Sequence, residues 1–193
     1  MTKTRIEAFS DGVIAILITI MVLELKVPHG TSWEHLQPAV FTLLMYLLSF
    51  IYLGIYWSNH HHMFHATKSV NGAVLWANLH LLFWLSLVPF ATTWMGENHF
   101  TAFPTSVYGA VLLAAAIAYT ILLRCIIRHE GPHSTLASAV GNDGKGKLSV
   151  ALYASAIPLA FVHALIADAI YVAVALIWLI PDRRIESRFT RET

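Results

Sequence analysis

The chain has 193 residues, of which 57% are hydrophobic and only 12% are charged, and its formal net charge is +1. A soluble domain carries about a quarter charged residues, so this chain has too few to cover a water-exposed surface. No basic run or stripe is present that could neutralise a row of phosphates, which argues against a nucleic-acid partner. The single cysteine, Cys125, has no second thiol with which to form a disulfide, a zinc site or a redox pair.

Apolar stretches close to the length that crosses a bilayer, about 20 residues, recur along the whole sequence. The sequence therefore predicts an all-α, polytopic membrane protein that forms a single domain over residues 1–193. The last two stretches are continuous, and we expect a short turn near His163 and Asp168 to divide them. The predicted spans are residues 6–25, 40–57, 70–95, 107–127, 148–165 and 167–180.

The distribution of basic residues predicts the topology, because Lys and Arg concentrate on cytoplasmic loops. With six transmembrane helices and a cytoplasmic N-terminus, every Lys and Arg except Lys26 falls on the cytoplasmic side. Five helices would leave the C-terminal arginines on the outer side, so we expect six helices and both termini in the cytoplasm. Residues 131–147 are rich in Gly, Ser, Asn and Asp and are predicted to form a flexible cytoplasmic loop.

The first predicted helix carries polar groups where it meets the membrane: Arg5, Glu7, Ser10 and Asp11. Charges at a membrane are costly unless they are paired or hydrated, so they mark function more often than in soluble proteins. A plainer interpretation is that Ser10 and Asp11 suit a helix N-terminus while Arg5 reaches the lipid headgroups. These residues alone leave both interpretations open.

Farther along this helix, Ile16, Ile20 and Leu23 recur at i, i+4 and i+7 and share one face, with Thr19 beside them. Such a stripe suits helix packing or lipid contact as well as the wall of a pore, and periodicity does not choose among them. Glu24 lies at the predicted outer end, where a carboxylate can raise the local concentration of cations.

The residues from Arg5 to Glu24 fit the string R-x-x-x-F-S-D-G-V-x-A-I-x-x-T-x-x-x-L-E. This string resembles the signature of the transmembrane protein 175 family of potassium channels. The second span ends in W-S-N-H-H at 57–61, similar to the family's W-x-x-H pattern, and the third carries Asn78 and then P-F-A-T at 89–92, similar to its N and P-F-x-T elements. These motifs cover the first half of the chain, whereas the second half agrees in helix number and topology only.

The resemblance implies a passive, modestly potassium-selective channel in the bacterial cell membrane. It implies a homotetramer in which the first helices of four copies line a central pore, with K⁺ as the permeant ion, no cofactor, and none of the T-V-G-Y-G filter that ordinary potassium channels carry. The implied constriction is hydrophobic, at Ile16, Ile20 and Leu23, with a hydroxyl position at Thr19. Apolar rings can close a pore by dewetting, and a hydroxyl ring can replace part of an ion's water shell.

The resemblance also implies a network that braces the pore helix against the second and third spans. Its members are Arg5, Phe9, Ser10, Asp11, Trp57, His60 and Asn78.

The eleven histidines raise an alternative, because the run His60-His61-His62-x-x-His65 has a spacing that can bind a transition metal on a helix, and His80 could add a ligand. A histidine-metal membrane enzyme therefore competes with the channel. However, the chain offers one such run, with no carboxylate in it, so no metal ligand or catalytic residue is predicted. A secondary cation transporter is the third alternative, but it predicts inverted repeats and broken helices, which the sequence does not clearly show.

Overall fold

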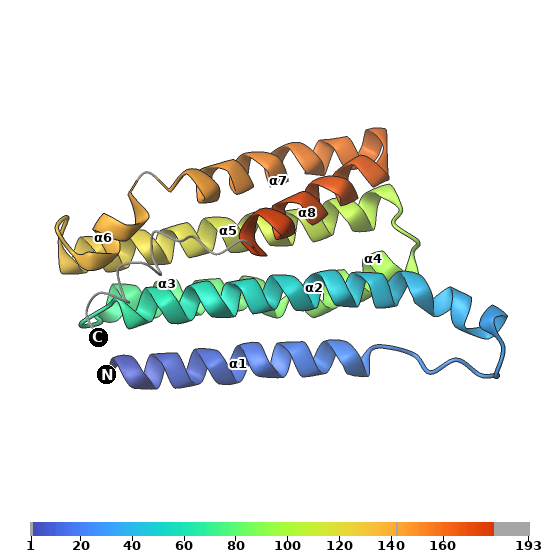
Figure 1. Cartoon of the computed structure of the whole chain (residues 1–193), viewed down its shortest axis with the longest axis horizontal. Helices are drawn as coiled ribbons and strands as arrows, with labels where there is room; N and C mark the ends of the chain where they lie inside the picture. Colours follow the sequence, from blue (N-terminus) through green and yellow to red (C-terminus); the bar gives the residue numbers. More distant parts are fainter. Residues whose placement is uncertain (1, 142, 180–193) are drawn as a thin grey trace.

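The computed structural model describes residues 2–141 and 143–179, and the regular elements there are all helices, as predicted (Figure 1). Five of them are apolar and long enough to cross a bilayer when α3 and α4 are counted as one continuous span. A sixth apolar helix, α8, is shorter. The helices are α1 (Lys3–Leu23), α2 (Trp33–His65), α3 (Gly72–Ser86), α4 (Val88–Glu97), α5 (Ala102–Glu130), α6 (Thr135–Val140), α7 (Gly144–Val162) and α8 (Ala164–Leu179).

The third span is broken at Leu87, which the sequence analysis did not anticipate. Pro89 lies in the first turn of α4. Proline has no N–H to donate and restricts the residue before it, so it favours a new helix start over an uninterrupted helix. The two helices nevertheless follow one another along the bundle (Figure 1).

The long apolar stretch at the end of the chain divides at His163, whose backbone is extended (φ −160°, ψ 110°) between α7 and α8. The turn thus falls slightly earlier than the predicted boundary between residues 165 and 167. Asp168 lies inside α8 rather than at the turn. The C-terminal arginines that entered the topology prediction lie outside the described residues.

The connection predicted as a loop at 131–147 contains the helix α6 and the first turn of α7, so the prediction of an irregular loop was wrong there. Ser134 caps α6 by accepting from the backbone N–H of Ala137 (3.2 Å), and Asp143 caps α7 by accepting from Gly146 (3.1 Å). Six residues of α6 are too few to show a helical period, which is why the sequence pattern missed it.

The helices other than α6 alternate in direction along the bundle: α1, α3 with α4, and α7 run one way, and α2, α5 and α8 run the other (Figure 1). The described Lys and Arg residues lie toward one end, except Lys26, which lies toward the opposite end. α5 packs against α3, α4, α7 and α8, whereas α1 lies at the edge of the bundle and packs against α2, α3 and α4. This leaves much of α1 uncovered.

Candidate functional site

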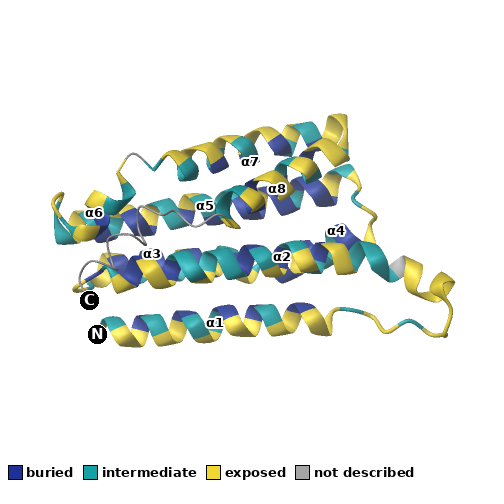
Figure 2. Cartoon of the chain, in the orientation of Figure 1, coloured by how far each residue is buried: buried dark blue, intermediate teal, exposed yellow. Residues whose placement is uncertain are grey.

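Helix α1 has one face packed into the bundle and another that is uncovered (Figure 2). The packed face consists of Ile6, Ser10, Ile14, Leu17 and Met21. The uncovered side chains include those predicted to line a pore: Ile16 is 57% exposed, Ile20 39% and Leu23 81%. The predicted pore positions therefore share one side of α1 that is largely uncovered, although residues of α4 partly cover Ile20.

Thr19 lies on the same uncovered side of α1, and its hydroxyl donates to the backbone carbonyl of Ile16 (2.8 Å). Because the hydrogen is used within the helix, the oxygen lone pairs are what Thr19 can offer to its surroundings. Lone pairs bind cations. The exposed oxygen of Thr19 can therefore accept a hydrogen bond or contact a cation.

The packed face of α1 is held by a buried polar chain that crosses three helices. Asn78 on α3 donates from its amide nitrogen to the hydroxyl of Ser10 on α1 (2.9 Å). Its amide oxygen lies 2.8 Å from Nε2 of His60 on α2. Because an amide oxygen can only accept, Nε2 of His60 carries the proton. All three side chains are at most 1% exposed.

The tautomer of His60 follows from this chain of hydrogen bonds. Nδ1 of His60 is buried and has no partner among the described residues. With the proton on Nε2, the orphaned Nδ1 of a neutral ring is an acceptor and not a donor. The ring also stacks on Phe64, at 4.5 Å between centroids, which holds it in place within α2. His60 therefore acts here as a structural donor.

A second bond holds α1 one residue farther along. The indole Nε1 of Trp57 donates to the carboxylate of Asp11 (3.0 Å). Trp57 and His60 lie one helical turn apart on α2, so neighbouring residues of α1 are bound from the same stretch of α2, one directly and one through Asn78. The residues of the motif at 57–61 and Asn78 thus contact the signature residues of α1 at the same height along the bundle.

Two members of the predicted network lie outside it. The side chains of Arg5 and Phe9 are exposed, Phe9 by 53%, and neither has a side-chain hydrogen bond to the described residues. Lys3, which the sequence analysis did not single out, binds instead: its ammonium donates to the carbonyls of Thr67 (2.9 Å) and His65 (3.3 Å). A cation near the last carbonyls of a helix is favourable, but these carbonyls lie 62 and 64 residues away in the chain, so no local sequence pattern indicates the contact.

A second buried polar cluster lies deeper in the bundle and contains Thr92, the last residue of the P-F-A-T element. Thr92 on α4 donates to the carbonyl of Val88 (2.7 Å) and shares a hydrogen bond with the hydroxyl of Ser49 on α2 (2.6 Å). Ser49 also meets the hydroxyl of Tyr108 on α5 (3.0 Å). The cluster joins α2, α4 and α5. Its partners lie 43 and 59 residues apart in the chain, so no local sequence pattern indicates the cluster.

Of the histidines in the competing enzyme interpretation, His61 lies near His62 and His65, but His60 and His80 are engaged elsewhere. His60 faces Asn78, whereas His61 stacks on His65 at 6.1 Å between centroids. His80 accepts a hydrogen bond from the indole of Trp84 in its own helix (2.9 Å). Among residues 2–141 and 143–179, no group of three or more His, Cys, Asp or Glu side chains is placed to hold a metal ion.

At the opposite end of α1, Glu24 lines a groove together with Glu97 of α4. Lys26 donates to the carboxylate of Glu97 (2.5 Å). This hydrogen bond, and then the attraction of the same carboxylate, raise the pKa of Lys26 above its ordinary value. Both partners are exposed, so the pair links the end of α1 to α4 without adding much stability.

Comparisons with known proteins agree with the sequence motifs. The sequence model of a family described as the endosomal/lysosomal potassium channel TMEM175 matches residues 5–89. The chain is 58% identical over 186 residues to a protein named as a potassium channel in Chryseobacterium sp., covering 96% of this chain and 97% of that one. It is 36% identical over 126 residues to a potassium channel of Streptomyces collinus, covering 61% of each chain.

A solved structure extends the likeness to the fold. The crystal structure of a lysosomal potassium-selective channel TMEM175 homolog from Chamaesiphon minutus superposes with a TM-score of 0.79 and 30% identity, covering 93% of this chain and 97% of that one. The likeness therefore includes the second half, where no sequence motif was found. These relatives are named as channels and not as enzymes. The chain belongs to the TMEM175 family.

Proposed function

We propose that this chain is a passive potassium channel that works as a homotetramer in a bacterial cell membrane. The names of its bacterial relatives and of the matched crystal structure support conduction of K⁺. One chain cannot enclose a pore with a single uncovered helix face, so several copies are required. In this proposal the α1 helices of four copies face one another across the central axis.

The observation that carries the proposal is the uncovered apolar surface of α1 at Ile16, Ile20 and Leu23, on a helix whose packed face is bound by directed hydrogen bonds. These hydrogen bonds fix which side of α1 stays uncovered. Four copies of these side chains would form stacked apolar rings, which resist wetting and keep the passage narrow. Thr19 would add a ring of hydroxyl lone pairs between them.

Both termini are proposed to lie in the cytoplasm. The gathering of the described Lys and Arg residues toward the end where α1 begins supports this, because such residues favour the cytoplasmic side. Ions would then enter from outside near Glu24 and Glu97, and leave past Phe9 and Arg5.

Flux measurements in liposomes test the proposal. Wild-type protein should pass K⁺ along a voltage without a coupled ion, and Ile16→Asn and Leu23→Asn should raise the flux and weaken the preference for K⁺ over Na⁺. Leu176→Asn is the matched control, because Leu176 is 56% exposed on α8 and lies outside the proposed pore. Flux that requires a second ion would establish a transporter, and equal flux in all three variants would remove α1 from the pore.

A further inference from the structure

A groove of about 480 Å³ lies between the second half of α5 and the first turns of α7, at the end of the bundle where the basic residues gather. It is separate from the uncovered face of α1. Its lining combines aliphatic side chains with two basic side chains and one acidic side chain. This pairing of apolar wall and charged rim does not serve the proposed pore.

The aliphatic wall runs along the membrane-spanning parts of both helices. Ile117 and Ile121 are one turn apart on α5 and are 42% and 40% exposed, and Val150 faces them from α7. Apolar surface at this depth suits a hydrocarbon chain. The wall by itself would accept any lipid, so the selectivity of the groove depends on its charged rim.

Two basic side chains, Arg124 of α5 and Lys147 of α7, line the rim. The acidic one, Asp143, is engaged with its own helix, where it accepts from the backbone N–H of Gly146 (3.1 Å). Gly146 allows this, because a Cβ there would lie 2.4 Å from the Asp143 carboxylate. Among the described residues that line the groove, Arg124 and Lys147 outnumber the single carboxylate, which favours an anion, and the start of α7 adds the positive end of a helix dipole.

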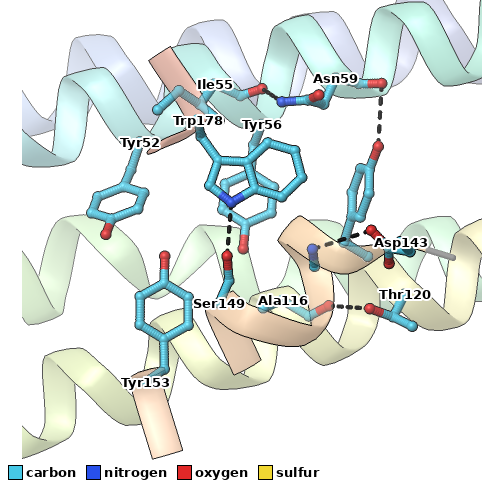
Figure 3. Close-up of a pocket in the computed structure, with 12 residues that line it drawn as sticks. Tyr52, Ile55, Tyr56, Asn59, Ala116, Thr120, Asp143, Ser149, Tyr153 and Trp178 are labelled. Atoms are coloured by element: carbon cyan, nitrogen blue, oxygen red, sulfur yellow. Dashed lines mark hydrogen bonds between the residues drawn. The ribbon is translucent and has the colours of Figure 1, made fainter. Parts of the chain in front are cut away.

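The neighbouring cavity in the bundle does not compete for such a ligand (Figure 3). It shares Thr120, Asp143 and Gly146 with the groove but holds only about 40 Å³, and Tyr52, Tyr56, Tyr119, Tyr153 and Trp178 enclose it. That volume has room for a few waters. A lipid headgroup is too large for this cavity and would occupy the groove instead.

We propose that this groove binds one anionic phospholipid. Its phosphate lies between Arg124 and Lys147, and an acyl chain lies along Ile117, Ile121 and Val150. Basic pockets between transmembrane helices bind anionic headgroups by this combination of charge and apolar contact. The lipid joins α5 to α7 and does not touch α1, so its binding can be measured separately from conduction.

Native mass spectrometry of the purified oligomer tests the proposal, with phosphatidylglycerol and phosphatidylcholine of equal chain length as probes. Wild-type protein should retain phosphatidylglycerol preferentially. Arg124→Gln and Lys147→Gln should each weaken it roughly five-fold, the change that corresponds to about 1 kcal/mol per basic residue. Arg128→Gln is the control, because Arg128 lies one turn farther along α5, is exposed and is not part of the groove lining. Arg124→Lys should restore most of the binding.

Three results would overturn the proposal: equal retention of the two lipids, an equal loss with Arg128→Gln, or displacement of the lipid by inorganic phosphate at matched concentration, which would reveal an anion site with no role for the acyl chain. Elution of each variant as an oligomer of wild-type size checks folding. Since retention is measured without ion flux, a non-conducting protein that still selects phosphatidylglycerol would refute the channel and leave the lipid site standing.

Discussion

His60 and Asn78 form a buried hydrogen bond, 2.8 Å long, that joins α2 to α3 directly behind Ser10 of α1. The amide of Asn78 uses its oxygen toward one helix and its nitrogen toward another. The position therefore requires a side chain that donates to Ser10 and accepts from His60, which an ionised carboxylate cannot do because it only accepts.

Replacing Asn78 by Ala is expected to destabilise the protein, because it leaves the buried Nε2–H of His60 without an acceptor and removes the donor to Ser10. An orphaned buried polar group costs about 1–3 kcal/mol. Unfolding in detergent micelles measures the loss. Asn98→Ala is the matched control, because Asn98 is exposed and its amide bonds only to Trp94 of its own helix (2.8 Å). Equal stability of the two variants would contradict the prediction.

Trp57→Phe should keep most of the aromatic contact and remove only the donor to Asp11. A hydrogen bond to a charged group contributes about 1.5–3 kcal/mol to stability. Because Trp57 is 47% exposed and water can replace the lost bond, we expect a destabilisation below about 1.5 kcal/mol. The same unfolding measurement applies. Trp76→Phe, at a ring that is 72% exposed, should have no effect. A larger loss in the control would show that the indole bond is not what matters.

Thr19→Val should lower the preference for K⁺ over Na⁺ and leave folding intact, since valine has the same shape without the oxygen lone pairs. We expect a fall of up to about tenfold in the permeability ratio, which corresponds to about 1.4 kcal/mol. Reversal potentials in mixed K⁺ and Na⁺ solutions give the ratio. Thr120→Val removes a similar intrahelical bond, to Ala116 (2.9 Å), on α5 and should leave selectivity unchanged. An unaltered ratio in Thr19→Val would exclude the hydroxyl from ion contact.

Glu24→Gln should reduce K⁺ conductance at low ionic strength and have little effect at high ionic strength, because a carboxylate concentrates cations only over the unscreened distance, about 10 Å at 0.1 M salt. Conductance at two salt concentrations separates the two regimes. Glu34→Gln is the control, since Glu34 is an exposed carboxylate in the first turn of α2 toward the same end of the bundle. Identical conductance of wild type and Glu24→Gln at low salt would end the hypothesis.

The sequence predicted an all-α chain of apolar helices because length and hydropathy are local properties. The partners of Ser10 were identified from family motifs, since a contact with Asn78, 68 residues away, leaves no local pattern. Periodicity could not say which side of α1 is uncovered, because isoleucine and leucine occur around most of the helix, with Ile14 buried and Ile16 exposed. Tertiary packing decides that.

The break at Leu87 shows a different limit. Its cause, Pro89, was visible in the sequence, but the apolar run continues through it, so the length criterion merged α3 with α4. The contact of Lys3 has no visible cause in the sequence. A single basic residue near a chain end is common, and only the fold brings Lys3 to the carbonyls of Thr67 and His65.

The hydrogen bonds to Ser10 and Asp11 fix α1 near its beginning, apolar contacts such as those of Leu17 and Met21 hold its second half, and the exposed pair Lys26–Glu97 adds a weak link beyond its end. Directed hydrogen bonds resist sliding more than apolar contacts do, so we expect a tilt of α1 to pivot near Ser10. Leu23 lies about 20 Å from that pivot at 1.5 Å per residue, so a tilt of about 5° moves it by about 2 Å. A small rotation at one end is thereby magnified at the other.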